Sequence, residues 1–179
     1  MKKLFLLLTL LLCTSMAWAH DVEVDGIYYN LNQTNKTATV TFKGSSYDSY
    51  DNEYSGEVVI PQKFIYDGIT YSVTSLEWGC FFGCTGLTSI TIPNSVTSLG
   101  DGCFANCERL ESIEVESGNT VYDSRENCNA IIETSSNTMI AGCKNTTIPN
   151  SVTSLREYCF SGCTGLTSIT IPNSVTSLG

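Results

Sequence analysis

Cysteine is the residue type whose number and spacing could most readily support chemistry in this chain. Nine cysteines are present, and the spacing Cys-x-x-x-Cys occurs three times, at Cys80/Cys84, Cys103/Cys107 and Cys159/Cys163. Such pairs can form disulfides in an exported protein, bind a tetrahedral zinc ion, or pack as small apolar side chains. Which of these uses applies depends on the structural elements in which the cysteines lie.

Those elements form an internal repeat. Residues 84–100 and 163–179 have identical sequences, 79 positions apart. Smaller matches recur every 23 positions: Cys80-Phe81 returns as Cys103-Phe104, and the Ile-Pro-Asn-Ser at 148–151 returns at 171–174. Two steps of 23 leave 33 positions, so one coil carries about ten additional residues. A fixed period of this length predicts an array of stacked coils in a β-rich solenoid with short parallel strands.

Each coil has a predicted internal structure. The pattern Leu87-x-x-Ile90-x-Ile92 is that of a leucine-rich-repeat strand whose three apolar side chains face the interior. Pro93 cannot donate to a strand ladder and ends this strand. A second short extended segment follows at 96–99, and the Cys-Phe segment at 103–104 is expected to begin a tight turn of the 3₁₀ or short helical kind.

Hydroxyl and carboxylate side chains alternate with the apolar strand positions, so they should point outward. Stacking in register would align them as ladders. Such ladders can be purely structural, or they can form a face that contacts a ligand. The candidate residues for a ligand-contacting face are Ser89, Thr91, Ser112, Glu114, Ser168 and Thr170.

The repeat favours buried thiols for most of the cysteines. Six of the eight that remain after Cys13 occupy two repeat columns, where small interior residues are needed. Disulfides between stacked coils are not excluded by distance, and Cys128 with Cys143, on either side of a predicted hairpin, is the pair best suited to one. A metal site is not expected, because the pairs recur with the coil and no histidine accompanies them.

The motif Leu-Thr-Ser-Ile-Thr-Ile-Pro-Asn-Ser-Val-Thr-Ser-Leu-Gly, followed by x-x-Cys-Phe-x-x-Cys, resembles the BspA-like leucine-rich repeats of bacterial surface proteins. Those repeats usually have Ala where this chain has Cys80, Cys103 and Cys159. The resemblance covers residues 73–179 well and 22–72 more loosely. It implies a surface-exposed protein that adheres to macromolecules of a host or a neighbouring cell, although the fold alone does not define a ligand.

The parts outside the repeat have their own expected roles. Residues 1–19 have the basic start, apolar run and Ala-Trp-Ala end of a signal peptide cleaved after Ala19. Residues 20–72 alternate as short strands and form a predicted antiparallel β cap, in which Tyr47, Tyr50 and Tyr54 either pack or offer a platform for sugars. An inserted hairpin is predicted within 116–147, with strands near 130–133 and 139–141 that project from the array or broaden it. The pattern breaks off at Gly179 in mid-coil, which predicts a longer array.

The net charge and the absence of known motifs restrict the classes of partner and activity that we expect. Loss of Lys2 and Lys3 with the signal lowers the net charge from −9 to −11, which disfavours nucleic acid and anionic membranes as partners. No apolar stretch in the mature part is long enough to span a bilayer. No catalytic or cofactor-binding motif is present, so neither an enzyme nor a cofactor is predicted. We therefore expect a secreted or cell-surface scaffold that binds an extracellular protein or glycan. The alternatives are a glycan-capturing or carbohydrate-active protein and a spacer for a further domain.

Overall fold

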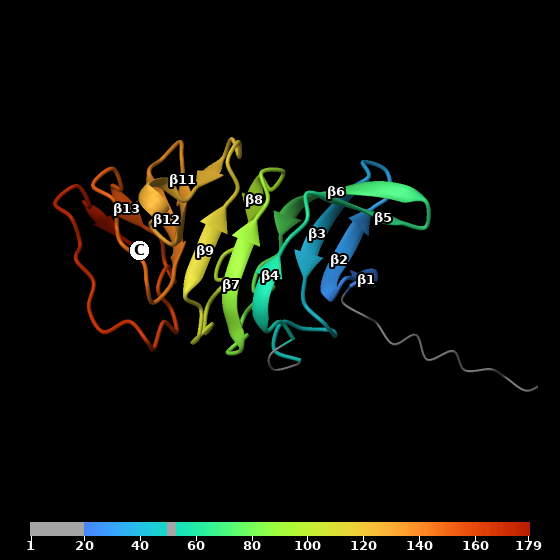
Figure 1. Ribbon diagram of the computed structural model, residues 1–179, viewed down its shortest axis with the longest axis horizontal. Helices are drawn as coiled ribbons and strands as arrows, with labels where there is room; N and C mark the ends of the chain where they lie inside the picture. Colours follow the sequence, from blue (N-terminus) through green and yellow to red (C-terminus); the bar gives the residue numbers. More distant parts are fainter. Residues whose placement is uncertain (1–19, 50–52) are drawn as a thin grey trace, which may run out of the picture.

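The computed structural model describes residues 20–49 and 53–179, and its elements follow one another along the long axis of the molecule (Figure 1). The predicted signal peptide and Tyr50 lie outside the described residues. Short β-strands make up nearly all of the regular structure. The described residues contain a single 3₁₀ helix, η1, at Arg125–Asn127.

The leader forms an antiparallel meander, as its alternating pattern predicts. Its strands are β1 (Val22–Val24), β2 (Ile27–Asn32) and β3 (Thr37–Thr41). The turn between β2 and β3 is closed by Asn32, whose Oδ1 accepts from the backbone N–H groups of Thr34 and Asn35. β3 then pairs in parallel with β6 (Ile69–Leu76), which crosses the expected junction between leader and repeats, and β5 (Lys63–Tyr66) forms a hairpin with β6. The leader is therefore hydrogen-bonded directly to the repeat array.

The first face of the array is a three-stranded parallel sheet. β7 (Leu87–Ile92) lies between β4 (Gly56–Val59) and β9 (Ser112–Val115). The register pairs Ile90 with Ile113, 23 positions apart, as the repeat predicts. Leu87, Ile90 and Ile92 are all fully buried, which confirms the predicted inward positions of the strand.

The predicted second extended segments of the coils form a second ladder, which is divided between two separate sheets. β8 (Ser98–Leu99) pairs in parallel with β6, and β13 (Ser154–Leu155) pairs in parallel with β14 (Ser177–Leu178). The last coil departs from the prediction, because 166–171 is not a strand although its sequence repeats that of β7. Ile171 is 47% exposed there, whereas the equivalent Ile92 is buried. The same residues thus form a strand only where a neighbouring strand pairs with them.

The predicted hairpin is present and broadens the array on one side. β11 (Ala130–Glu133) and β12 (Thr138–Gly142) are antiparallel, and β10 (Tyr122–Asp123) pairs with β11. β12 continues in parallel into β13, so the hairpin is a part of the second ladder. On the opposite side, the N–H of Asn106 donates to the carbonyl of Ser161 at 3.0 Å. The Cys-Phe turns before and after the insertion are therefore direct neighbours.

The Cys-Phe segments form the tight turns that we expected, but their i→i+3 hydrogen bonds do not continue into a 3₁₀ or other short helix. In the first of them, Phe82 N–H donates to Gly79 O and Cys84 N–H donates to Phe81 O. Gly79 and Gly83 have φ values of +64° and +70°. This left-handed backbone interrupts each turn after one hydrogen bond, so a helix cannot continue.

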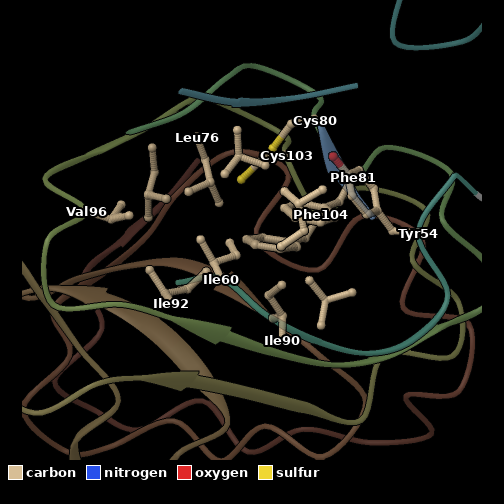
Figure 2. Packing of buried hydrophobic residues seen from close by; sticks show 14 of the residues in the cluster. Tyr54, Ile60, Leu76, Cys80, Phe81, Ile90, Ile92, Val96, Cys103 and Phe104 are labelled. Atoms are coloured by element: carbon tan, nitrogen blue, oxygen red, sulfur yellow. The ribbon is translucent and has the colours of Figure 1, made fainter. Parts of the chain in front are cut away.

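The core runs through the centre of the coils (Figure 2). Ile90 and Ile92 of the parallel sheet face Leu76 of β6 and Val96, which precedes β8, with Phe81 near the turns. The Phe81 and Phe104 rings stack at 5.3 Å, with their planes only 10° apart, so the aromatic column follows the repeat. Tyr54 also contacts Phe81 and is only 2% exposed. This tyrosine of the leader therefore packs into the core.

Candidate ligand-binding face

The outward positions of the parallel sheet form two continuous rows. In one row Glu57, Ser89 and Ser112 are register neighbours on β4, β7 and β9. In the other row Val59, Thr91 and Glu114 are neighbours. Ser89, Thr91, Ser112 and Glu114 are therefore brought onto one surface, as the sequence predicts.

This outward surface changes in character from strand to strand. On β4 the exposed residues are Glu57 and Val59, which is 54% exposed. Ser89 and Thr91 on β7 are half-buried between their neighbours, and Glu114 on β9 is exposed. The sheet therefore offers a carboxylate at both edges, with an apolar group beside the one on β4 and hydroxyl groups between the two edges.

Ser168 and Thr170 do not join these rows. They are exposed in the irregular segment of the last coil and line a separate cavity of about 550 Å³ together with Thr147 and Asn150. The inserted hairpin separates this coil from β9, so the stacking that would have aligned all six candidate residues is interrupted. The candidate face consists of two surfaces.

A second cavity, of about 310 Å³, lies beside β9. Its wall includes the strand residues Ser112 and Glu114 and the inserted residues Ser124, Asn127 and Asn129. Ser124 Oγ accepts from the N–H of Val115 at 2.9 Å and donates to the carbonyl of Ala130 at 2.7 Å. This serine therefore holds the inserted segment against the end of the strand.

The residues that the insertion contributes to this cavity were not predicted from the sequence. The available signal was the Glu-Asn-Cys-Asn segment at 126–129, because asparagine adopts left-handed backbone more readily than most residues. Glu126, Asn127 and Asn129 have φ values of 60°, 51° and 51°. Glu57 and Val59 were also missed, since β4 is not related to β7 by the 23-residue period.

The cysteine columns lie in the interior, in agreement with the expected buried thiols. All the cysteines from Cys80 to Cys159 are buried, and Cys163 is partly buried. Cys80 and Cys103 are side-chain neighbours in adjacent coils, and Cys107 Sγ donates to the carbonyl of Phe81 at 3.1 Å. Burial raises the pKa of the Cys84 and Cys163 thiols to about 11 and that of Cys159 to about 12. Neutral thiols of this kind are poor nucleophiles and poor metal ligands.

Cys128 and Cys143, the pair that we considered best suited to a disulfide, are both free thiols in the structure. Each sulfur has its own backbone acceptor: Cys128 Sγ contacts Ala130 O at 3.8 Å, and Cys143 Sγ donates to Asn129 O at 3.4 Å. Thr146 Oγ1 also donates to Asn129 O, at 2.6 Å. The link across the base of the hairpin is thus made by hydrogen bonds.

Two further features concern chemistry and membranes. Within 20–49 and 53–179, no group of three or more His, Cys, Asp or Glu side chains is arranged to hold a metal ion. In the same described ranges, no helix has the length and apolarity needed to cross a bilayer.

Comparison with known families identifies the repeat. The model of the BspA type leucine rich repeat region matches residues 63–140 and 132–179, with six copies of the repeat. The chain belongs to this family. The match begins ten positions before residue 73, where the 23-residue pattern was first visible, and so it includes β5. No curated protein matches the sequence of this BspA-type chain.

Solved structures of leucine-rich repeat proteins are similar to this BspA-type chain. One from Eubacterium ventriosum is 26% identical over 68% of this chain and 31% of its own, with a TM-score of 0.52. One from Bacteroides ovatus is 26% identical over 89% of this chain and 32% of its own, with a TM-score of 0.49. A leucine rich cell surface protein from Faecalibacterium prausnitzii is 23% identical over 88% and 44%, with a TM-score of 0.48. The chain thus spans about a third of the length of the Eubacterium ventriosum and Bacteroides ovatus proteins. The similarity to the Eubacterium ventriosum structure supports a shared leucine-rich-repeat fold.

Proposed function

We propose that this chain is an exported solenoid scaffold at the cell surface, or secreted, that binds an extracellular macromolecule through the outward rows of β4, β7 and β9. The main observation in support of this proposal is the strand register. It places Glu57, Ser89 and Ser112 in one row and Val59, Thr91 and Glu114 in the other. The inward positions of the same strands are apolar and buried, so stability and recognition use opposite sides of one sheet.

The composition of this surface supports a protein or glycan partner. Hydroxyl groups flanked by a carboxylate on each side can hydrogen-bond to a polar partner over a broad area, and Val59 adds an apolar contact at one edge. The net charge of −9 disfavours nucleic acid and anionic lipid surfaces. The pattern of a signal peptide at 1–19 supports export.

A binding screen tests this function. The purified chain is applied to immobilised extracellular matrix proteins and to a glycan array, with circular dichroism to verify that it is folded. We expect at least one specific partner, whose affinity Ser89→Arg lowers by about tenfold, equivalent to about 1.4 kcal/mol. Ser98→Arg is the matched control, because Ser98 is exposed in the same coil but lies on the second ladder. Equal loss with both variants, or no partner for the folded protein, would contradict the proposal and favour a spacer.

A further inference from the structure

We propose that the cavity between β9 and the inserted η1 segment binds one neutral sugar residue of a glycan. This inference rests on the proposed binding function and assigns it a site and a ligand chemistry. The cavity volume of about 310 Å³ is at the lower end of the range of about 300–1,000 Å³ that is usual for small-ligand sites. Such a space suits a single ring of a saccharide.

The edge of β9 that faces the cavity is closed at both ends. β9 is the last strand of its sheet, so its second edge has no strand partner. Before the strand, the N–H of Lys144 donates to Leu110 O at 3.3 Å, and at its end Ser124 Oγ accepts from Val115 N–H at 2.9 Å. Only Glu111 to Glu114 lie between these contacts, a length of about 13 Å at ~3.3 Å per residue.

This short opening distinguishes between two kinds of ligand. A peptide that adds to a sheet edge needs an uninterrupted run of free backbone groups along the strand. The contacts at Leu110 and Val115 leave too little edge for such a run. A compact ligand that presents several hydrogen-bonding groups around a ring fits the opening better.

The side chains in the cavity match the hydroxyl groups of a sugar. Among the described residues, the side chains of Ser112, Glu114 and Asn127 have no hydrogen-bond partner. The Asn127 amide can donate and accept, and the Glu114 carboxylate can accept from two adjacent hydroxyl groups. The charge of Glu114 and the negative charge of the whole chain repel anionic sugars, so the ligand should be neutral.

The wall of the cavity is preorganised. Two of its backbone positions, at Asn127 and Asn129, are left-handed, as is the neighbouring Glu126. Ser124 Oγ holds this segment by its two hydrogen bonds, to Val115 and Ala130. A site whose backbone is already fixed loses less conformational entropy when a ligand binds.

The test uses the purified chain with a panel of methyl hexopyranosides and N-acetylhexosaminides, and follows backbone amide shifts by NMR. We expect at least one neutral sugar to shift the amides of Ser112, Glu114 and Ser124. Glu114→Gln keeps the shape of the side chain and removes its charge, and Asn127→Gly removes a side chain at a position where glycine is unstrained. Each variant should weaken binding by about tenfold.

Asn106→Gly is the control, since Asn106 is exposed outside the cavity and has left-handed backbone like Asn127, and it should change affinity by less than about twofold. Sugar binding that neither cavity variant weakens would overturn the inference, as would a preference for sialylated or sulfated sugars. Binding of proteins but of no sugar would reject the inference and leave the proposed function standing. Failure to bind either class would reject both.

Discussion

The backbone N–H of Asn106 donates to the carbonyl of Ser161 at 3.0 Å, across the coil that carries the insertion. A Cβ added to Gly162 would lie 2.3 Å from Asn106 Cα and 2.5 Å from its nitrogen. The two turns are therefore packed as closely as their backbones allow, and the closeness depends on the absence of a side chain at residue 162.

Gly162→Ala should strongly destabilise the protein, whereas Gly83→Ala at the equivalent position of the first coil should cost less. Both glycines are left-handed, with φ values of 75° and 70°, so each alanine costs about 1–2 kcal/mol in backbone strain. Of the two added Cβ atoms, only the one at Gly162 would meet backbone within 3 Å, and the one at Gly83 would have nothing within 4 Å. Overpacking should add about 1–3 kcal/mol at Gly162, measurable by urea denaturation. Equal losses in the two variants would show that the two turns do not touch.

The inserted hairpin should contribute to the stability of the whole array. Ile132 is fully buried in a cluster with Met139 and Val152. Ile132→Ala should therefore lower the free energy of unfolding by about 2–5 kcal/mol. Ile65→Ala, at a residue 71% exposed, should change it by less than about 0.5 kcal/mol. If both variants unfold at the wild-type midpoint, the hairpin is not packed as described.

Thiol counting should find free cysteines that are slow to react. Burial raises the pKa of the column thiols, so an aromatic disulfide reagent at pH 8 should label the native protein slowly. Cys163, which is partly exposed, should react first, and all eight cysteines of residues 20–179 should react in denaturant. A count below eight without reductant, with a matching mass loss of about 2 Da per bond, would reveal a disulfide.

The pH dependence of stability should contain a contribution from Glu53. Partial burial raises the pKa of this carboxyl from 4.5 to about 7, an effect only partly offset by the hydrogen bond from Lys43 N–H and the charge of Lys43. Between these two values the folded state binds more protons than the unfolded state, so stability falls as pH rises from 4.5 to 7.

Glu53→Gln removes this titration and keeps an oxygen acceptor for Lys43 N–H. The difference in melting temperature between variant and wild type should therefore move in favour of the variant from pH 5 to pH 8, as measured by differential scanning calorimetry. A difference that is constant across this range would show that the carboxyl titrates normally in the folded protein.

The sequence predicts the repeated part of the fold well because the repeat is a packing pattern. Leu87, Ile90 and Ile92 are spaced as an inward strand face, and the structure buries all three. The register of Ser89 with Ser112 and of Thr91 with Glu114 follows from the 23-residue period, so two of the three strands of the candidate face were also predictable.

The remaining part depends on contacts that no period encodes. Ser168 and Thr170 repeat the residues of β7, but their segment has no paired strand and they lie on a separate surface. Asn127 reaches the cavity only because left-handed backbone turns the inserted segment toward β9. Local sequence did not specify where a non-repeating segment would dock.

The insertion adds strands on one side of the molecule and none on the other. β11 and β12 stand between β10 and β13, while the turns that contain Asn106 and Ser161 touch directly. Strands are spaced about 4.8 Å apart, so one side is longer by about 10 Å and the hairpin acts as a wedge. The stacking axis must change direction at this wedge. A large partner that contacts coils on both sides of the hairpin would therefore meet two surfaces inclined to each other.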